Sequence, residues 1–166
     1  MGRDALGKAL DGIDERMAVR QPGPGRWSVL ECVEHLAIAE QLLLSRLTSA
    51  VRSDGSHPNP AREAKILERG LDRTTSVQAS EAGRPHGRFR NLDEALSFFD
   101  SVRTETVRFV EGFSGDPRCW LTSHPLIPGP VNCYEILLLM SIHPVRHARQ
   151  IGEIRAALAG APGFAA

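Results

Sequence analysis

Two histidines four residues apart lie in an apolar segment near the C-terminal end of the chain. His143 and His147 interrupt a stripe of apolar residues at helical spacing, formed by Ile136, Met140, Ile151, Ile154 and Leu158. In a helix these positions stack along one face, so both imidazoles would face the core. Imidazoles in a core lose their hydration and need partners. A shared metal ion could satisfy both rings, and His35 occupies a comparable place in an earlier apolar segment.

The spacing of His143 and His147 suits a metal site. Side chains four residues apart in a helix lie about 5–6 Å apart at Cβ, and both ring nitrogens can then reach one ion at roughly 2.0–2.1 Å. The alternative is that both are core histidines satisfied by other polar groups. The apolar setting of the pair, together with His35, favours the metal interpretation. Three protein ligands would leave coordination positions open, which is typical of catalytic sites.

Glu31 precedes His35 by one helical turn, and several roles are open to it. It could be a fourth ligand, accept a hydrogen bond from an imidazole, or act as a general base. It could also only complete a capping box with Ser28. Gln150 follows His147 by one turn and could orient ligands, or it is a polar residue at the edge of the stripe.

His124 lies in a segment rich in proline and glycine just before the last predicted helix, where it could fold over one end of the site. The other candidates have simpler interpretations. We expect His57 and His86 to be solvated, Cys32 to be a small core residue, and Trp27 and Trp120 to anchor loops.

Composition is that of an ordinary globular domain and excludes some classes of protein. Twenty basic residues balance twenty acidic ones, so the chain offers little general attraction for nucleic acid. No apolar run reaches the roughly 18 residues of a membrane span, and the first residues are not those of a signal peptide. Three cysteines without a CxxC pair fit a reduced cytoplasm better than a disulfide framework.

Helical spacing of apolar residues predicts four long helices, over residues 4–20, 28–51, 92–113 and 132–159. Between them lie a polar connection over 53–91, with a short helix at 61–71, and a loop over 116–131. Little in the chain predicts strands. These features indicate a four-helix bundle with long crossover connections, forming one domain over residues 1–160 with a flexible tail at 161–166. Pro144 should kink the last helix beside His143.

Three blocks of sequence resemble the DinB-like family of metal-binding four-helix bundles. The first is the early helix motif Trp27-Ser28-Val29-Leu30-Glu31-Cys32-Val33-Glu34-His35-Leu36. The second is the loop His124-Pro125-Leu126-Ile127-Pro128-Gly129-Pro130. The third is Ile142-His143-Pro144-Val145-Arg146-His147-Ala148-Arg149-Gln150-Ile151, which is similar to a His-x-x-x-His-x-x-Gln-Ile ending. The blocks follow one another in the family's order and span most of the chain.

The resemblance implies a bundle of up-down-down-up topology and a divalent metal ion, often nickel or zinc, on His35, His143 and His147. It also implies a homodimer, and relatives that include transferases and isomerases dependent on low-molecular-weight thiols such as bacillithiol or mycothiol. Pro144 departs from the family's pattern and could shift His143 relative to His147.

Two functional hypotheses follow. The first is a metal-dependent enzyme, a thiol S-transferase or related hydrolase, in which the metal lowers the pKa of a thiol that attacks a small electrophile. The second is a non-catalytic dimeric bundle that binds metal or acts in a stress response. DNA binding is disfavoured because the chain lacks a basic stripe.

Overall fold

The computed structural model describes residues 2–75 and 77–160. In chain order the helices are α1 (Gly2–Leu10), α2 (Glu15–Ala18), α3 (Val29–Thr48), α4 (Pro60–Leu71), α5 (Leu92–Gly112) and α6 (Cys133–Ala159). Two single 3-10 turns, η1 (Glu81–Gly83) and η2 (Pro117–Cys119), precede α5 and the strand hairpin respectively. The strands are β1 (Val51–Arg52), β2 (Trp120–His124) and β3 (Ile127–Asn132). The tail predicted for residues 161–166 lies outside the described residues.

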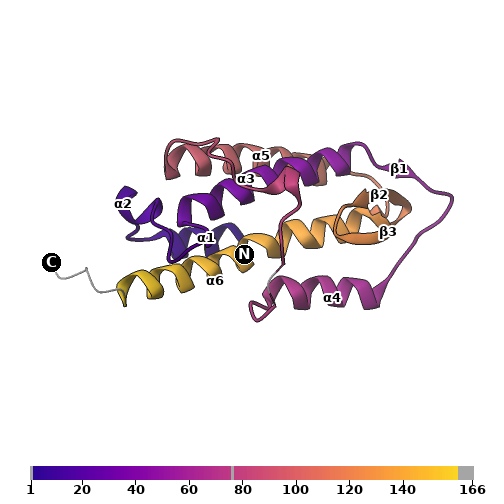
Figure 1. Ribbon diagram of the computed structural model, residues 1–166. Coiled ribbons are helices and arrows are strands. Elements are labelled where there is room, and N and C mark those ends of the chain that lie inside the picture. Colours follow the sequence, from indigo (N-terminus) through magenta and orange to yellow (C-terminus); the bar gives the residue numbers. More distant parts are fainter. Residues whose placement is uncertain (1, 76, 161–166) are drawn as a thin grey trace.

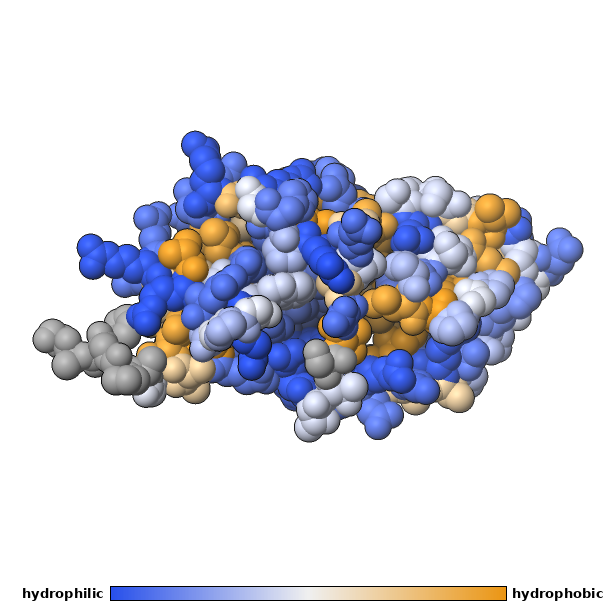
Figure 2. All heavy atoms as spheres, in the orientation of Figure 1, coloured by the Kyte–Doolittle hydropathy of each residue, from blue (hydrophilic) through white to orange (hydrophobic). Residues whose placement is uncertain are grey.

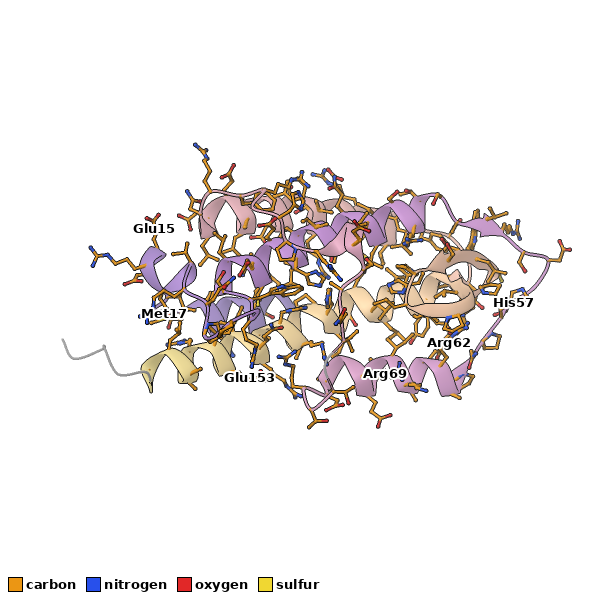
Figure 3. The ribbon with its side chains drawn as sticks, viewed as in Figure 1. Glu15, Met17, His57, Arg62, Arg69 and Glu153 are labelled. Atoms are coloured by element: carbon orange, nitrogen blue, oxygen red, sulfur yellow. The ribbon has the colours of Figure 1, made fainter. Side chains whose placement is uncertain are left out.

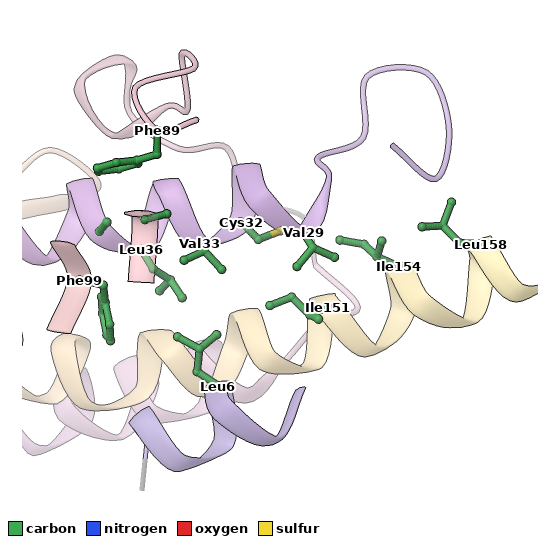
Figure 4. Packing of buried hydrophobic residues seen from close by; sticks show 12 residues of the cluster. Leu6, Val29, Cys32, Val33, Leu36, Phe89, Phe99, Ile151, Ile154 and Leu158 are labelled. Carbon is green, nitrogen blue, oxygen red and sulfur yellow. The ribbon is translucent and has the colours of Figure 1, made fainter. Parts of the chain in front are cut away.

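Helices α1, α3, α5 and α6 form a four-helix bundle, as predicted. Helix α3 packs on α5 and α6, and α1 packs on α6. Figure 1 shows α1 and α6 running in one direction and α3 and α5 in the other, which is the up-down-down-up order. One apolar cluster draws residues from all four helices, among them Leu6, Val33, Phe99 and Ile151 (Figure 4). Within the described residues, no helix combines the length and the hydropathy needed to cross a bilayer.

Local side-chain caps explain where the long helices begin. Ser28 and Glu31 form a reciprocal capping box at the start of α3, and Asn132 and Glu135 form another at the start of α6. The side chain of Asn91 accepts a hydrogen bond from the amide of Glu94, in the first turn of α5. The predicted starts at these three positions are therefore confirmed, because each depends on residues close together in the sequence.

The single helix predicted over residues 4–20 is wrong, since the structure divides it into α1 and α2. Gly12 adopts φ = 73°, a left-handed conformation that ends the first helix and that other residues rarely adopt. Asp14 then begins α2 by accepting a hydrogen bond from the amide of Met17. The apolar periodicity continues across the break, which is why the sequence alone did not reveal it.

Part of the loop predicted over residues 116–131 is a β-hairpin, which is a second correction. Strands β2 and β3 pair antiparallel, and β1 adds to the outer edge of β2 through Val51 and Leu121. The strands are short, and the pairing of β1 with β2 joins segments nearly seventy residues apart. Strand propensity along the sequence therefore did not predict this sheet. The hairpin leads directly into α6.

Helix α6 continues through Pro144 without interruption. Helix α4 matches the short helix predicted at residues 61–71 and packs against α6 on the side away from α5 (Figure 1). The contact is close at Gly70, where an added Cβ atom would overlap the side chain of Ile142. Glycine at this position therefore sets the distance between the two helices.

We predict opposite effects of alanine at two helical glycines. Gly70→Ala should lower the free energy of unfolding by about 1–3 kcal/mol, because the branched Ile142 side chain has to move. Gly152→Ala is the matched control in α6, where a Cβ atom would meet no atom within 4 Å. It should raise stability by about 0.5–1 kcal/mol through helix propensity. Urea denaturation measures both, and a stabilised Gly70→Ala variant would contradict the close contact.

Candidate metal centre

The three predicted histidines meet between α3 and α6. His35 comes from the middle of α3, and His143 and His147 come from successive turns of α6. The Nε2 atom of His143 lies 3.1 Å from Nε2 of His35 and 3.0 Å from Nε2 of His147. One ligand nitrogen from each ring lies within 4.8 Å of the other two, as a metal site requires. Pro144 therefore does not separate the two histidines of α6.

A backbone carbonyl fixes the orientation of His35. Its Nδ1 atom lies 2.5 Å from the carbonyl oxygen of Gly83, in the turn η1. A carbonyl can only accept, so Nδ1 carries the proton and Nε2 presents a lone pair to the other two rings. A second-nitrogen hydrogen bond of this kind is typical of metal-binding histidines. The sequence did not identify Gly83, because the contact spans 48 residues.

Burial keeps the three imidazoles neutral near pH 7. It lowers the pKa of His143 and His147 well below the usual value, and the neighbouring rings add to the effect. Burial also lowers the pKa of His35, although its hydrogen bond to Gly83 opposes this shift. The neutral imidazole is the form that binds a metal ion.

Hydrogen bonds among the rings cannot satisfy all three histidines. Nε2 of His35 can only accept. If Nε2 of His143 carries a proton, it can donate that proton to His35 or to His147, but not fully to both. One of the two short contacts therefore lacks a well-placed proton. In addition, Nδ1 of His147 is buried and has no partner among the described residues. A cation shared by the three Nε2 atoms removes the conflict, so the donor set fits a divalent metal ion.

Trp27 covers two of the rings, which is more than the loop anchor we expected. Its ring centroid lies 4.9 Å from that of His35 and 6.2 Å from that of His147, and the second pair is nearly parallel. The indole thus shields the cluster from water on the side of α3. By contrast, Trp120 packs against Phe113 in the opposite half of the molecule.

A cleft of about 1280 Å³ opens onto the histidines between α4 and the rest of the bundle. Figure 2 shows orange apolar side chains gathered there, with blue hydrophilic ones bordering them over α4. Glu31, His124 and Gln150 all line this cleft. The structure therefore brings the remaining predicted site residues near the three histidines, although their roles stay predictions.

Glu31 has its carboxylate engaged at the start of α3. One oxygen accepts a hydrogen bond of 2.6 Å from the amide of Ser28, and both lie 3.1–3.2 Å from the side-chain amide of Gln21. The capping interpretation is correct, and it leaves Glu31 on the cleft wall rather than among the three ring nitrogens.

Arg146 is a component of the cleft wall that the sequence did not reveal. It lies one residue before His147, and its guanidinium donates to the carbonyl oxygens of Arg69, Asp72 and Thr75. These carbonyls end α4 and begin the segment after it, so Arg146 holds α4 over the cleft. Only the position of α4 against α6 makes this role visible.

The other candidates behave as predicted. Cys32 is fully buried in the core, and burial raises its pKa to about 12, so it is no reactive thiol. His57 and His86 are exposed. Figure 3 places His57 on the connection between β1 and α4, far from the centre of the bundle.

We predict that His124 makes the protein sensitive to acid. Burial, and then Arg46, lower its pKa in the folded state to about 4. As the pH falls from about 6.5 towards 4, the unfolded chain takes up a proton that the folded one excludes, so stability falls. Urea denaturation at pH 7 and pH 4.5 should show that His124→Gln loses about 1–3 kcal/mol less than the unmodified protein. The exposed-site control, His57→Gln, should follow the unmodified protein; equal losses in all three would contradict the burial of His124.

Comparison with known proteins agrees with this architecture. The protein described as "Crystal structure of TT2238, a four-helix bundle protein" superposes with a TM-score of 0.57 at 19% identity, over 92% of this chain and 90% of that one. No curated protein matches the sequence. The sequence description of the DinB superfamily matches residues 1–151. The chain, with three histidines gathered between its second and last bundle helices, belongs to the DinB superfamily.

Proposed function

We propose that this protein is a metal-dependent enzyme, a thiol S-transferase or a related hydrolase, with a divalent metal ion held by His35, His143 and His147. The observation that carries the proposal is the convergence of three neutral imidazole nitrogens beside an open cleft. Imidazole is a ligand suited to nickel and zinc alike. When bound, such an ion supplies a Lewis acid that lowers the pKa of a coordinated thiol or water.

The chain's own residues would prepare the site in three ways. Gly83 fixes the tautomer of His35, so that its lone pair faces the other two histidines. Trp27 limits access of water to the rings of His35 and His147. The cleft leaves one side of the cluster accessible to a small molecule. Together these features describe a rigid ligand set with an accessible face, as catalytic metal sites have.

Proton transfer would fall to groups on the cleft wall. Glu31, in the first turn of α3, is an acidic side chain of the cleft, and we propose it as the acceptor of the proton released by a thiol or water. His124 and Gln150 line the same cleft and would contact the substrate. The cysteines are free thiols, which is compatible with the cytoplasmic location we propose. The homodimer implied by the family stays part of the proposal.

A non-catalytic metal-binding bundle is the second candidate. The observation that favours it is the engagement of both Glu31 oxygens by Ser28 and Gln21, which commits this carboxylate to the start of α3. In that case metal would bind, but thiols would not change its coordination.

We predict that His147→Ala loses bound metal and keeps its helix content. Elemental analysis of untagged protein should find close to one divalent ion per chain in the unmodified protein and almost none in the variant. His57→Ala is the matched control, because it removes an exposed histidine distant from the cluster. Circular dichroism would verify the fold. Retention of one ion by His147→Ala would refute the ligand assignment.

The enzyme and the binding bundle differ in their response to thiols. In cobalt-loaded protein, a thiol that enters the coordination sphere should produce a thiolate-to-cobalt absorption band. An unchanged spectrum with every thiol tested would support the non-catalytic alternative.

A further inference from the structure

The cleft beside the histidines is strongly cationic, although the chain as a whole is neutral. Eight arginine and lysine residues line it, against two acids, Glu31 and Glu153. The whole chain has twenty of each kind. The surplus is therefore a property of this cleft and not of the protein's composition.

Some of these cations already have structural partners. Arg62 pairs with Glu135, Arg73 pairs with Glu153, and Arg146 binds the end of α4. Figure 3 shows where Arg62 and Glu153 lie, on α4 and α6 respectively. These groups shape the walls of the cleft, and their charge is largely balanced or committed.

Four others, Arg26 among them, form no side-chain hydrogen bond or ion pair with any described residue, and three of the four lie along the cleft on α4 or directly after η1. Lys65 and Arg69 lie one turn apart on α4, and Arg84 follows η1, the turn whose Gly83 carbonyl binds His35. Like charges one helical turn apart repel each other and lower the stability of the helix. Lys65 and Arg69 therefore lower the stability of α4 slightly. An external anion bound between these cations would relieve their repulsion.

We propose that the cleft selects small molecules that carry oxyanion groups, carboxylate or phosphate, and that Lys65, Arg69 and Arg84 bind those groups. The inference rests on the proposed function, since it names the substrate class of the same site. A cleft with apolar walls focuses the field of its cations. Guanidinium groups bind carboxylate and phosphate in the same bidentate manner, so both oxyanions share this chemistry.

The test uses metal-free protein and three probes: succinate, inorganic pyrophosphate and neutral succinamide. Amide resonances of the cleft residues should shift with succinate or pyrophosphate and far less with succinamide. Whichever oxyanion binds more tightly identifies the preferred group.

The double variant Lys65→Gln/Arg69→Gln should weaken binding about tenfold. The control Lys8→Gln/Arg108→Gln removes the same charge from exposed positions outside the cleft and should leave binding unchanged.

Equal binding of succinamide, or an unchanged affinity in the cleft variant, would overturn the inference. Because no metal is present, the result is independent of the metal assignment. A protein that binds succinate in the cleft but takes up no cobalt keeps the oxyanion site and loses the proposed enzyme function. The reverse result keeps the metal site and removes the oxyanion selectivity.

A separate observation concerns the turn of α6 that carries His143. Proline has no amide hydrogen, so Pro144 cannot donate to the carbonyl oxygen of Met140, four residues earlier. That oxygen instead accepts a 2.9 Å hydrogen bond from the guanidinium of Arg103 on α5. The same nitrogen of Arg103 binds the carboxylate of Glu40 on α3, also at 2.9 Å. A side chain from another helix thus replaces the missing backbone donor.

Burying the Arg103–Glu40 ion pair to satisfy one carbonyl oxygen carries a desolvation penalty. Glu40 is only 3% exposed, and burial raises its pKa, although Arg103 and Thr106 oppose the shift. Arg103 also has a buried Nε atom that finds no hydrogen-bond partner in the described part of the chain. Buried ion pairs of this kind seldom stabilise a protein more than apolar side chains of similar size would. A role beyond stability therefore explains the pair better.

The geometry points to Arg103 as a positioning residue for the metal centre. It acts through the Met140 carbonyl on the turn where α6 passes Pro144, between His143 and His147. By holding this turn from α5, it sets the angle between the two rings. Glu40 keeps the guanidinium in place from α3, the helix that carries His35.

The test compares Arg103→Met/Glu40→Gln with the same variant carrying Pro144→Ala. Replacing both partners avoids leaving a buried charge alone. Cobalt affinity should fall about tenfold in the double variant, with a changed visible spectrum. Alanine at position 144 restores an amide donor to Met140, so most of the loss should be recovered. The control Arg3→Met/Asp100→Asn removes an ion pair between α1 and α5 and should not change cobalt binding.

Imidazole proton and carbon resonances of His143 and His147, recorded without metal, give a second measurement. They should shift in Arg103→Met/Glu40→Gln and return towards their original positions with Pro144→Ala. Unchanged resonances in the double variant, or no recovery with Pro144→Ala in either measurement, would refute the positioning role. This arm does not depend on whether cobalt binds.

Discussion

The enclosure of three imidazoles between α3 and α6, with His35 and His147 buried and His143 partly buried, is the constraint on which the rest of this structure depends. Removing these rings from water is unfavourable unless their nitrogens find partners, and the rings cannot satisfy one another at the distances observed. The backbone carbonyl of Gly83 accepts a hydrogen bond from His35, and the indole of Trp27 packs over the ring of His35. Three lone pairs that face a common point complete the arrangement when they share a cation.

Charged side chains support this cluster from several directions, each by replacing a backbone partner that is missing. The buried carboxylate of Glu34, next to His35, accepts the amides of His86 and Arg88 and so holds the segment that follows Gly83. Arg146, next to His147, holds the open end of α4. Arg103 takes the place of the amide that Pro144 lacks. The residues adjacent to the histidines thus fix the elements that surround them.

The positive charges around the site all act in the same direction. Burial and nearby cations both favour the neutral form of the imidazoles, and Arg146 contributes to the lowered pKa of His143 and His147. The same positive potential favours an anionic ligand in the cleft. A neutral ligand set beside a cationic wall would accept a metal ion and a negatively charged molecule together, since the charges of those two compensate each other.

The sequence by itself determined the features that depend on neighbours along the chain. The caps at Ser28, Asn91 and Asn132 set the starts of the long helices, and the four-residue spacing of His143 and His147 placed both rings on one face. The bundle and its three histidines could therefore be predicted. Only the tertiary structure decided the break at Gly12, the pairing of β1 with β2, and the contacts of Gly83, Arg146 and Arg103. Apolar periodicity does not register a local backbone reversal, and a hydrogen bond across 37 to 77 residues leaves no local pattern, because it forms only after the helices have packed.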